Sequence, residues 1–428
     1  MSSKHTFGVR MRVPEGGGRW CQPTCPQELN PPHLGPASSR QAGLRTLRNL
    51  PRLSRIEGAI HSAGKRADEP SCMRRRDMTP LRLADSHPNL RVALVLGGGN
   101  ALGAYHAGVY QALEEAGVEP QWIVGTSIGA VTGAIIVGNA RADRLNRLRR
   151  LWRPEHQGDA WSNPASYLPE TLRRTGAALE TLVFGRTGMF ASLGSTAAWW
   201  RRDDGAGAPA LYDVRALRET LIDLIDFDRL NRGATRFTAV AVDIESGEEA
   251  WFDTRDREIG PDHIRASAAL ISTFPAITID DRLFGDGGLS MNLPIDPVMA
   301  WSEPAPLLCF ASDLLPLASQ RPRSLGEVLS RTQDLLFAAQ SRRTIERWQA
   351  VFAAEQDRSR QSITLVNLAY TDQGREVAGK AMDFSPRSVR ERWEAGYRDG
   401  SQAIADLVGG HIAVGAPGLS VHSATRPG

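Results

Sequence analysis

The chain has 428 residues, of which 41% are hydrophobic and 23% charged, a composition typical of a soluble globular protein with one or two domains. The net charge of +3 conceals an asymmetry, because residues 1–88 carry a net charge of +8 and the remaining residues a net charge of −5. Since the positive charge is confined to that segment and no basic, aromatic-rich recognition motif accompanies it, we expect no nucleic-acid partner.

Cysteine content and hydropathy predict a cytoplasmic protein. Only Cys309 lies beyond the first 88 residues, which excludes an internal disulfide framework and favours a reducing compartment. The first 30 residues lack the apolar stretch of a secretory signal peptide. Residues 122–138 are uncharged, but their glycine, serine and threonine content favours a buried strand, a turn and a helix over a transmembrane helix.

The first segment of the chain, residues 1–88, is rich in proline, arginine, glycine and serine and has no sustained hydrophobic period. This composition predicts disorder. A start of translation at Met73 or Met78 is an alternative interpretation, under which the upstream residues are not made.

The folded part of the chain is predicted to begin at residue 91. Residues 92–96 form a short apolar run that enters glycines, as a buried parallel strand does, and residues 101–116 have helical spacing. Residues 121–124 and 128–139 repeat this pattern of a strand and a helix. Two such units within about 50 residues predict an α/β domain with a mainly parallel sheet.

Residues 140–210 interrupt this alternation and are predicted to form an insertion or a lid. Residues 141–153 have the spacing of an amphipathic helix. The aromatic residues that follow are interpreted as side chains that pack on the sheet. Their position beside Arg201 and Arg202 also suits a membrane interface, which is the alternative interpretation.

The elements after the insertion divide the rest of the chain into two regions. Further strands and helices up to residue 312 complete a predicted domain over residues 89–312. Residues 313–428 are predicted to be a mainly helical C-terminal region, whose end from Gly409 onward is expected to be frayed. Within it we expect helices over 324–352 and 385–407 and one strand over 362–368.

A serine nucleophile is indicated by the sequence Gly125-Thr-Ser-Ile-Gly129, which lies between a predicted strand and a predicted helix. Two glycines permit a turn that is too tight for a Cβ atom, and Ser127 is then held at the N-terminus of the helix. The helix dipole at that position favours the negative charge that develops during nucleophilic attack.

A glycine run from Gly97 to Gly103 lies at an earlier junction between a strand and a helix. It fits neither a dinucleotide fingerprint nor a phosphate loop, because the positions that those motifs require as glycine or lysine hold other residues. Backbone amides left free at Gly98, Gly99 and Asn100 suit an oxyanion instead.

The third motif, Asp286-Gly287-Gly288, follows a predicted strand and can supply a carboxylate base. Triad hydrolases of the α/β class order their residues serine, aspartate, histidine along the chain, and His411 or His422 could complete such a triad. Neither histidine has the local context of a catalytic residue. The motifs therefore predict a serine hydrolase that acts without histidine. Burial of Asp286 is expected to raise the pKa of its carboxyl and make it a stronger base.

The three motifs, in this order and setting, resemble those of the patatin-like phospholipase family over roughly residues 92–310. The resemblance implies a three-layer α/β/α fold with a mainly parallel central sheet, followed here by a C-terminal helical extension. It also implies a Ser127–Asp286 dyad and an oxyanion hole formed by residues 98–100. Asn100 stands where the family usually has glycine, and asparagine tolerates the left-handed backbone that such a loop needs.

The resemblance further implies that the substrate is a lipid or another acyl ester, with peripheral contact to a membrane. The reaction needs no cofactor and no metal. Two alternatives are kept: a Ser–Asp–His esterase of the α/β-hydrolase class, and a non-catalytic lipid-binding protein that has retained the fold.

Overall fold

The computed structural model describes residues 89–152, 168–194, 210–271, 273–300, 303, 305–355 and 361–423. All of them belong to one compact unit, Met73–Gly428. Most of the predicted N-terminal segment and Arg201 and Arg202 lie outside the described residues, so the predictions made for them stay predictions. Within the described part of the chain, none of the helices combines the length and the apolar character that a membrane-crossing helix needs.

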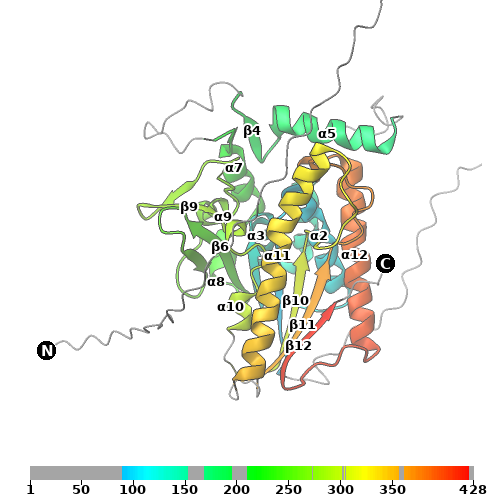
Figure 1. Ribbon diagram of the computed structural model, residues 1–428. Coiled ribbons are helices and arrows are strands. Elements are labelled where there is room, and N and C mark those ends of the chain that lie inside the picture. Colours follow the sequence, from blue (N-terminus) through cyan, green and yellow to red (C-terminus); the bar gives the residue numbers. More distant parts are fainter. Residues whose placement is uncertain are drawn as a thin grey trace, which may run out of the picture. The chain divides into compact units, whose positions relative to one another are not determined.

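A nine-stranded sheet forms the centre of the described structure (Figure 1). Its strands are β1 (Arg91–Leu96), β2 (Trp122–Thr126), β6 (Arg236–Asp243), β7 (Glu249–Asp253), β8 (Ile277–Ile279), β9 (Arg282–Asp286), β10 (Leu307–Asp313), β11 (Ser362–Ala369) and β12 (Gly418–Ser423). Their order is β12-β11-β10-β1-β2-β6-β9-β8, and β7 also pairs with β6. The pairs from β12 to β6 are parallel, whereas β7, β8 and β9 join in antiparallel pairs.

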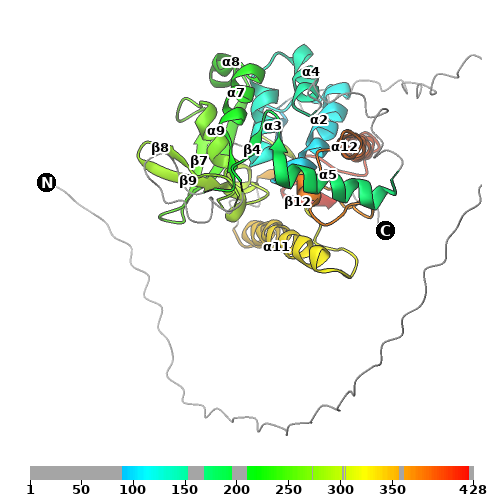
Figure 2. The same ribbon diagram turned by 90° about the horizontal axis from the view of Figure 1, so that it is seen from above.

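Helices cover both faces of this sheet, as the view from above shows (Figure 2). One face carries α2 (Ala104–Glu115), α3 (Ile128–Val137) and α12 (Pro386–Val408), and the other carries α11 (Leu325–Ala354). The other helices are α4 (Arg141–Trp152), α5 (Glu170–Phe184), α7 (Arg215–Leu224), α8 (Phe227–Arg232), α9 (Pro261–Ser267) and α10 (Asp296–Met299), with short 3-10 turns η1 (Asn100–Gly103), η4 (Gly287–Leu289) and η6 (Lys380–Met382). A small second sheet holds β3 (Gly185–Arg186), β4 (Phe190–Ser192) and β5 (Tyr212–Asp213). The predicted three-layer α/β/α architecture is confirmed.

Two hydrophobic clusters, one on each face of the sheet, explain why its central strands are apolar throughout. In β1, Leu94 and Leu96 belong to the cluster beneath α2 and α3, whereas Ala93 and Val95 belong to the cluster beneath α10 and α11. A strand buried on both faces cannot alternate between apolar and polar residues. The continuous run in the sequence is therefore the signature of a central strand.

Close packing of α2 against α12 joins the two ends of the described chain. A Cβ atom on Gly108 would lie 1.9 Å from the carbonyl oxygen of Trp393, and one on Gly396 would lie 2.0 Å from that of Tyr105. Glycine at these two positions lets the helix backbones touch. The C-terminal helix is thus fitted to α2 at the level of the main chain.

The C-terminal region also contributes to the sheet. The strand predicted over residues 362–368 is confirmed as β11. The prediction of a frayed end from Gly409 onward is wrong, because β12 pairs with β11 along the sheet edge. Its apolar residues, Leu419 and Val421, alternate with polar ones and pack on the cluster beneath α11. A domain boundary at residue 312 stays a prediction.

Candidate active site

The turn between β2 and α3 holds Ser127 in a conformation that few non-glycine residues adopt, with φ 57° and ψ −126°. Both neighbouring glycines are required by close backbone approaches. A Cβ atom on Gly129 would lie 2.1 Å from the carbonyl oxygen of Leu96, and one on Gly125 would lie 2.5 Å from the nitrogen of Ala130. The turn therefore lies tightly against the end of β1, with the serine at its apex.

Ser267, at the end of α9, anchors this turn. Its carbonyl oxygen and its hydroxyl oxygen both accept a hydrogen bond from the Ser127 amide, each at 3.1 Å. The Ser267 hydroxyl in turn donates to the carbonyl oxygen of Val240 at 2.6 Å, and Ser267 is fully buried. No local sequence pattern indicates this role of Ser267, because its contacts join segments that are far apart in the sequence.

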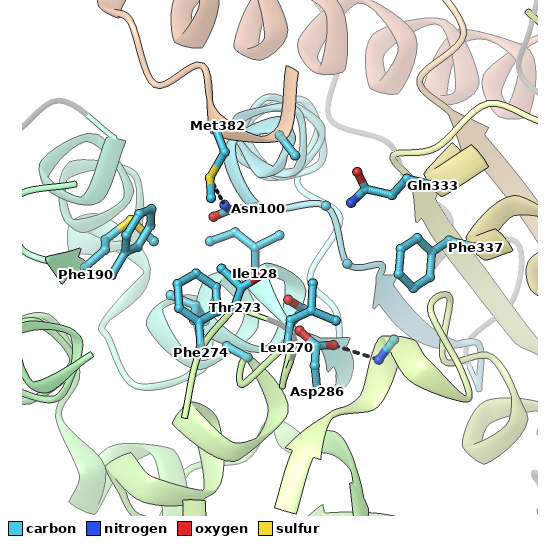
Figure 3. A pocket seen from close by; sticks show the side chains of 18 of the residues that line it. Asn100, Ile128, Phe190, Leu270, Thr273, Phe274, Asp286, Gln333, Phe337 and Met382 are labelled. Carbon is cyan, nitrogen blue, oxygen red and sulfur yellow. Dashed lines mark hydrogen bonds between the residues drawn. The ribbon is translucent and has the colours of Figure 1, made fainter. Parts of the chain in front are cut away.

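Strand register brings Asp286 to the serine. β6 lies between β2 and β9, and Thr126 is level with Val240 while Asp286 is level with Ala241. The two motifs consequently meet at one end of β6, although 158 residues separate their positions in the numbering. Figure 3 shows Asp286 in the wall of the cavity described below.

Asp286 is almost completely buried, with 4% of the surface of the residue exposed. Burial raises the pKa of this carboxyl from the ordinary value of 3.8 to about 6. The Ser127 side chain and a 2.7 Å hydrogen bond from the Gly288 amide oppose that rise in pKa. The sequence-based expectation of a raised pKa is confirmed. A carboxylate with a pKa near 6 is ionised at neutral pH and can accept a proton.

The glycine loop lies beside Ser127, but not all three of its predicted oxyanion donors have a free amide. The Gly98 amide already donates to the carbonyl oxygen of Asn292 at 3.0 Å, so it is not free to bind an oxyanion. No acceptor for the amides of Gly99 and Asn100 is found among the residues that the structure describes. Asn100 has the left-handed backbone that its residue type tolerates, with φ 50°.

Gly98 brings bare backbone against the nucleophile. A Cβ atom on Gly98 would lie 3.2 Å from the Cβ atom of Ser127 and 2.6 Å from Oδ1 of Asn292. Asn292 is buried, and a Cβ atom on Gly288 would lie 3.0 Å from the same Oδ1. Asn292 thus holds the glycine loop and the Asp286 turn at a fixed separation, a role that sequence reasoning had not assigned to it.

A cavity of about 290 Å³ opens over these groups and is lined mainly by apolar side chains (Figure 3). Ser127 and Asp286 lie in its wall together with Gly98, Gly99, Asn100 and Gly288. Its apolar lining comes from widely separated elements and includes Ile128, Leu182, Phe190, Phe274, Phe337 and Met382. Gly97, Gly103 and Gly287 are not among the lining residues and serve the backbone of the two loops.

No histidine lines this cavity among the described residues. His106 is fully buried, and its two ring nitrogens lie 2.8 Å from Oγ of Ser312 and 2.8 Å from the carbonyl oxygen of Gly97. Burial lowers the pKa of His106 to about 4, so it is neutral and supports the glycine loop. The His411 side chain is exposed, and its Nδ1 lies 3.6 Å from Oδ1 of Asp406.

His422 is the remaining triad candidate, and its strand is four places from β2 in the sheet. Neighbouring strands are about 4.8 Å apart, so His422 lies roughly 19 Å from the strand that precedes Ser127. Neither His411 nor His422 is therefore placed where an imidazole could relay a proton between Ser127 and Asp286.

Two protein-family models match the chain. One, described as patatin-like phospholipase, matches residues 94–299 and so includes the glycine loop, Ser127 and Asp286. The other, described as patatin phospholipase, matches residues 323–407, which include α11, β11 and nearly all of α12.

The curated proteins that are similar to this chain are longer than the segment over which they match it. An uncharacterised NTE family protein of Mycobacterium tuberculosis is 27% identical over 208 residues, which are 49% of this chain and 45% of that protein. Lysophospholipase NTE1 of Mycosarcoma maydis is 26% identical over 277 residues, or 60% of this chain and 12% of that protein. The chain thus spans less than half the length of these relatives.

Among solved structures, VipD from Legionella pneumophila matches 74% of this chain and 67% of its own, with a TM-score of 0.38 and 14% sequence identity.

The two family models agree on one family, and the residues that the first of them matches include all three motifs. The chain therefore belongs to the patatin-like phospholipase family.

Proposed function

We propose that this protein is a serine hydrolase of lipid acyl esters, a phospholipase A-type enzyme or a lipid acyl hydrolase, that acts through Ser127 and Asp286. The observation that carries the proposal is the location of these two side chains together in the wall of one apolar cavity, where the Ser127 side chain lowers the pKa of the buried Asp286 carboxyl. Membership of the patatin-like phospholipase family supports lipid-ester hydrolysis.

The reaction begins with proton transfer from the Ser127 hydroxyl to Asp286 as the serine oxygen attacks the acyl carbonyl carbon. The carbonyl π electrons move onto its oxygen, and the amides of Gly99 and Asn100 donate hydrogen bonds to this oxyanion. When the tetrahedral intermediate collapses, the bond to the leaving alcohol breaks and Asp286 returns the proton to that oxygen. Water then attacks the acyl carbon while Asp286 takes one of its protons. The bond to the serine oxygen breaks, Asp286 returns the proton to that oxygen, and the fatty acid is released.

A buried aspartate suits this role better than an exposed one. A carboxylate with an ordinary pKa of 3.8 is a weak base at neutral pH, whereas a pKa of about 6 is close to the pH at which the proton must be taken. The Gly288 amide donates a hydrogen bond to Oδ1 of Asp286 at 2.7 Å and helps to orient the carboxylate.

The apolar lining favours an acyl chain as the part of the substrate that the cavity binds. A fatty acyl chain would contact the aromatic rings of Phe190, Phe274 and Phe337, which Figure 3 shows around the cavity. Its carbonyl carbon would then lie at Ser127. No cofactor or metal is needed for the proposed steps.

Exposed apolar side chains on the two helices beside the cavity support peripheral contact with a membrane. Leu182 of α5 and Phe337 of α11 line the cavity, and both helices reach the same end of the molecule (Figure 1). Phe184 is 73% exposed and Leu325 is 75% exposed. Helices that carry such residues on a solvent face are typical of proteins that dock at a lipid interface. The exposed set comprises Leu172, Leu179, Leu182, Val183 and Phe184 on α5 and Leu325, Val328, Leu329, Leu335 and Leu336 on α11.

Active-site labelling tests the proposal most directly. A fluorophosphonate should label the purified protein at Ser127, the label should be absent in Ser127→Ala, and its rate should fall in Asp286→Ala. Incubation with mixed membrane lipids, followed by identification of the products, should show released fatty acids and lyso-lipids. Absence of both label and products from the intact protein would favour the non-catalytic lipid-binding alternative.

A further inference from the structure

The C-terminal region contacts the glycine loop through Arg392, a fully buried residue of α12. Its Nη1 donates to the carbonyl oxygen of Ala101 at 3.1 Å and to that of Asp383 at 2.6 Å, and its Nη2 donates to that of Lys380 at 3.0 Å. The guanidinium also forms a two-pronged pair with the carboxylate of Glu376, at 2.8 and 2.7 Å. Ala101 is the only one of these partners that belongs to the glycine loop.

A second contact reaches the same loop one residue earlier. Nδ2 of Asn100 donates to Sδ of Met382 at 3.3 Å, and Met382 lines the cavity (Figure 3). Residues of the segment 376–383 therefore form part of the cavity wall. Together, Met382 of this segment and Arg392 of α12 hold two successive residues of the loop, Asn100 and Ala101. No other region of the described chain is seen to contact both of them by hydrogen bonds.

Asn100 needs such support because its backbone is left-handed, with φ 50°. Conformations of this kind in non-glycine residues persist where surrounding contacts determine them. A hydrogen bond on the Asn100 side chain and another on the Ala101 carbonyl restrict rotation on both sides of this strained position. The orientation of the Asn100 amide, which would face the oxyanion, depends on the same torsion angles.

We propose that Arg392 is a positioning residue for the oxyanion loop, and that it acts through the Ala101 carbonyl to aim the amides of Gly99 and Asn100. This inference rests on the hydrolase function proposed above. Under this inference the C-terminal region contributes to catalysis, although none of the three catalytic motifs lies in that region. Because the donors must be aligned to within a fraction of an ångström, a small rotation of the loop lowers the rate without abolishing substrate binding.

A purely structural role for Arg392 makes a different prediction. A buried ion pair can often be replaced by apolar residues with little loss of stability, provided that both charges are removed together. Removing Arg392 alone would leave the buried Glu376 carboxylate with one of its two arginine partners, Arg174 at 3.0 Å, and with the Tyr370 hydroxyl, which donates to it at 3.0 Å. The informative comparison therefore changes Glu376 in every variant and Arg392 in only one of them.

The test compares Glu376→Gln with the double variant Glu376→Gln/Arg392→Met. Both lose the carboxylate, and only the second loses the donor to the Ala101 carbonyl. We measure kcat and KM with a soluble acyl ester, the rate of fluorophosphonate labelling, and thermal unfolding. The expected result is that kcat and the labelling rate of the double variant fall at least about tenfold below those of Glu376→Gln, while KM stays within twofold. Equal kcat values in the two folded variants would overturn the inference.

Arg392→Lys decides the matter if the double variant does not fold. A lysine keeps the positive charge opposite Glu376, but a single ammonium cannot reproduce the fork that reaches a carboxylate and several carbonyl oxygens at once. We expect kcat to fall at least about threefold, and an unchanged kcat in a folded Arg392→Lys protein would refute the positioning role. Arg174→Met is the matched control, because Arg174 shares Glu376 with Arg392, whereas its other ion pairs with described residues are with Glu170, Asp383 and Glu391 and not with the glycine loop.

The two proposals fail in different ways. If the unaltered protein neither hydrolyses esters nor reacts with the fluorophosphonate, the hydrolase function is wrong and the positioning role falls with it. If the unaltered protein is active and the double variant keeps the kcat of Glu376→Gln, only the positioning role is wrong.

Discussion

Replacing Asp286 by asparagine should make the protein more stable and inactive at the same time. The substitution keeps the shape of the side chain and an oxygen that can accept the Gly288 amide, which donates to Asp286 at 2.7 Å. It removes a charge that burial disfavours. The base of the proposed reaction is lost, so kcat should fall by about 10²-fold or more.

The size of the stability change follows from the pKa of Asp286. Its rise from 3.8 to about 6, at about 1.36 kcal/mol for each pKa unit, corresponds to about 3 kcal/mol. The sign is fixed by linkage: the folded state binds the proton more tightly than the unfolded state. The stabilising contribution of Asp286 is therefore complete below pH 3.8 and is lost as the pH rises through about 6. Asp286→Asn should exceed the unaltered protein in free energy of unfolding by about 3 kcal/mol at pH 8 and by about half of that at pH 5.

Denaturant unfolding at pH 5 and pH 8 measures both differences. Asp313→Asn is the matched control, because burial also raises the pKa of Asp313 to about 6, and this carboxyl does not line the cavity. Asp313→Asn should show a similar pH-dependent gain in stability while activity is retained. If the difference in unfolding free energy between Asp286→Asn and the unaltered protein is the same at pH 5 and pH 8, the pKa of Asp286 is not raised by burial and the reasoning is refuted.

Three further outcomes are expected. The double substitution of His411 and His422 by alanine should leave kcat within about twofold, since neither residue lines the cavity, and a loss at either position would support a triad instead. Gly129→Ala should lower the free energy of unfolding by about 2 kcal/mol or more, measured by denaturant titration, because its Cβ atom would lie 2.1 Å from the Leu96 carbonyl oxygen; an unchanged midpoint would contradict that packing. Phe184→Asp should weaken binding to phospholipid vesicles in sedimentation by about threefold or more without altering hydrolysis of a soluble ester, and equal vesicle binding would argue against α5 as a docking helix.

The sequence predicts this site well where one local pattern is sufficient. The strand, the Gly-x-Ser-x-Gly turn and the following helix are contiguous, so Ser127 and its glycines can be recognised from residues 121–139 alone. The raised pKa of Asp286 also follows from its setting at the end of a buried strand. These features depend on short-range backbone geometry, which the residue types specify directly.

Other features depend on contacts between distant segments, which no local pattern reveals. The sequence predicts a free amide at Gly98, and only the fold shows that this amide donates to the carbonyl oxygen of Asn292. Arg392 reads as one of many arginines on a helix, whereas in the structure it lies against Ala101, 291 positions away. β12 was missed because an edge strand with one apolar face and several small residues resembles a loose end.

The place of β10 in the sheet limits how this chain can be shortened. β10 has β1 on one side and β11 on the other, and it begins beyond the last residue matched by the first family model. A fragment that ended with that match would leave β1 with an open, apolar border, and α2 would lose the helix fitted against its backbone. Open borders of this kind recruit other chains. The smallest unit that can be expected to fold without an open sheet border at β1 is therefore larger than the segment by which the family is recognised.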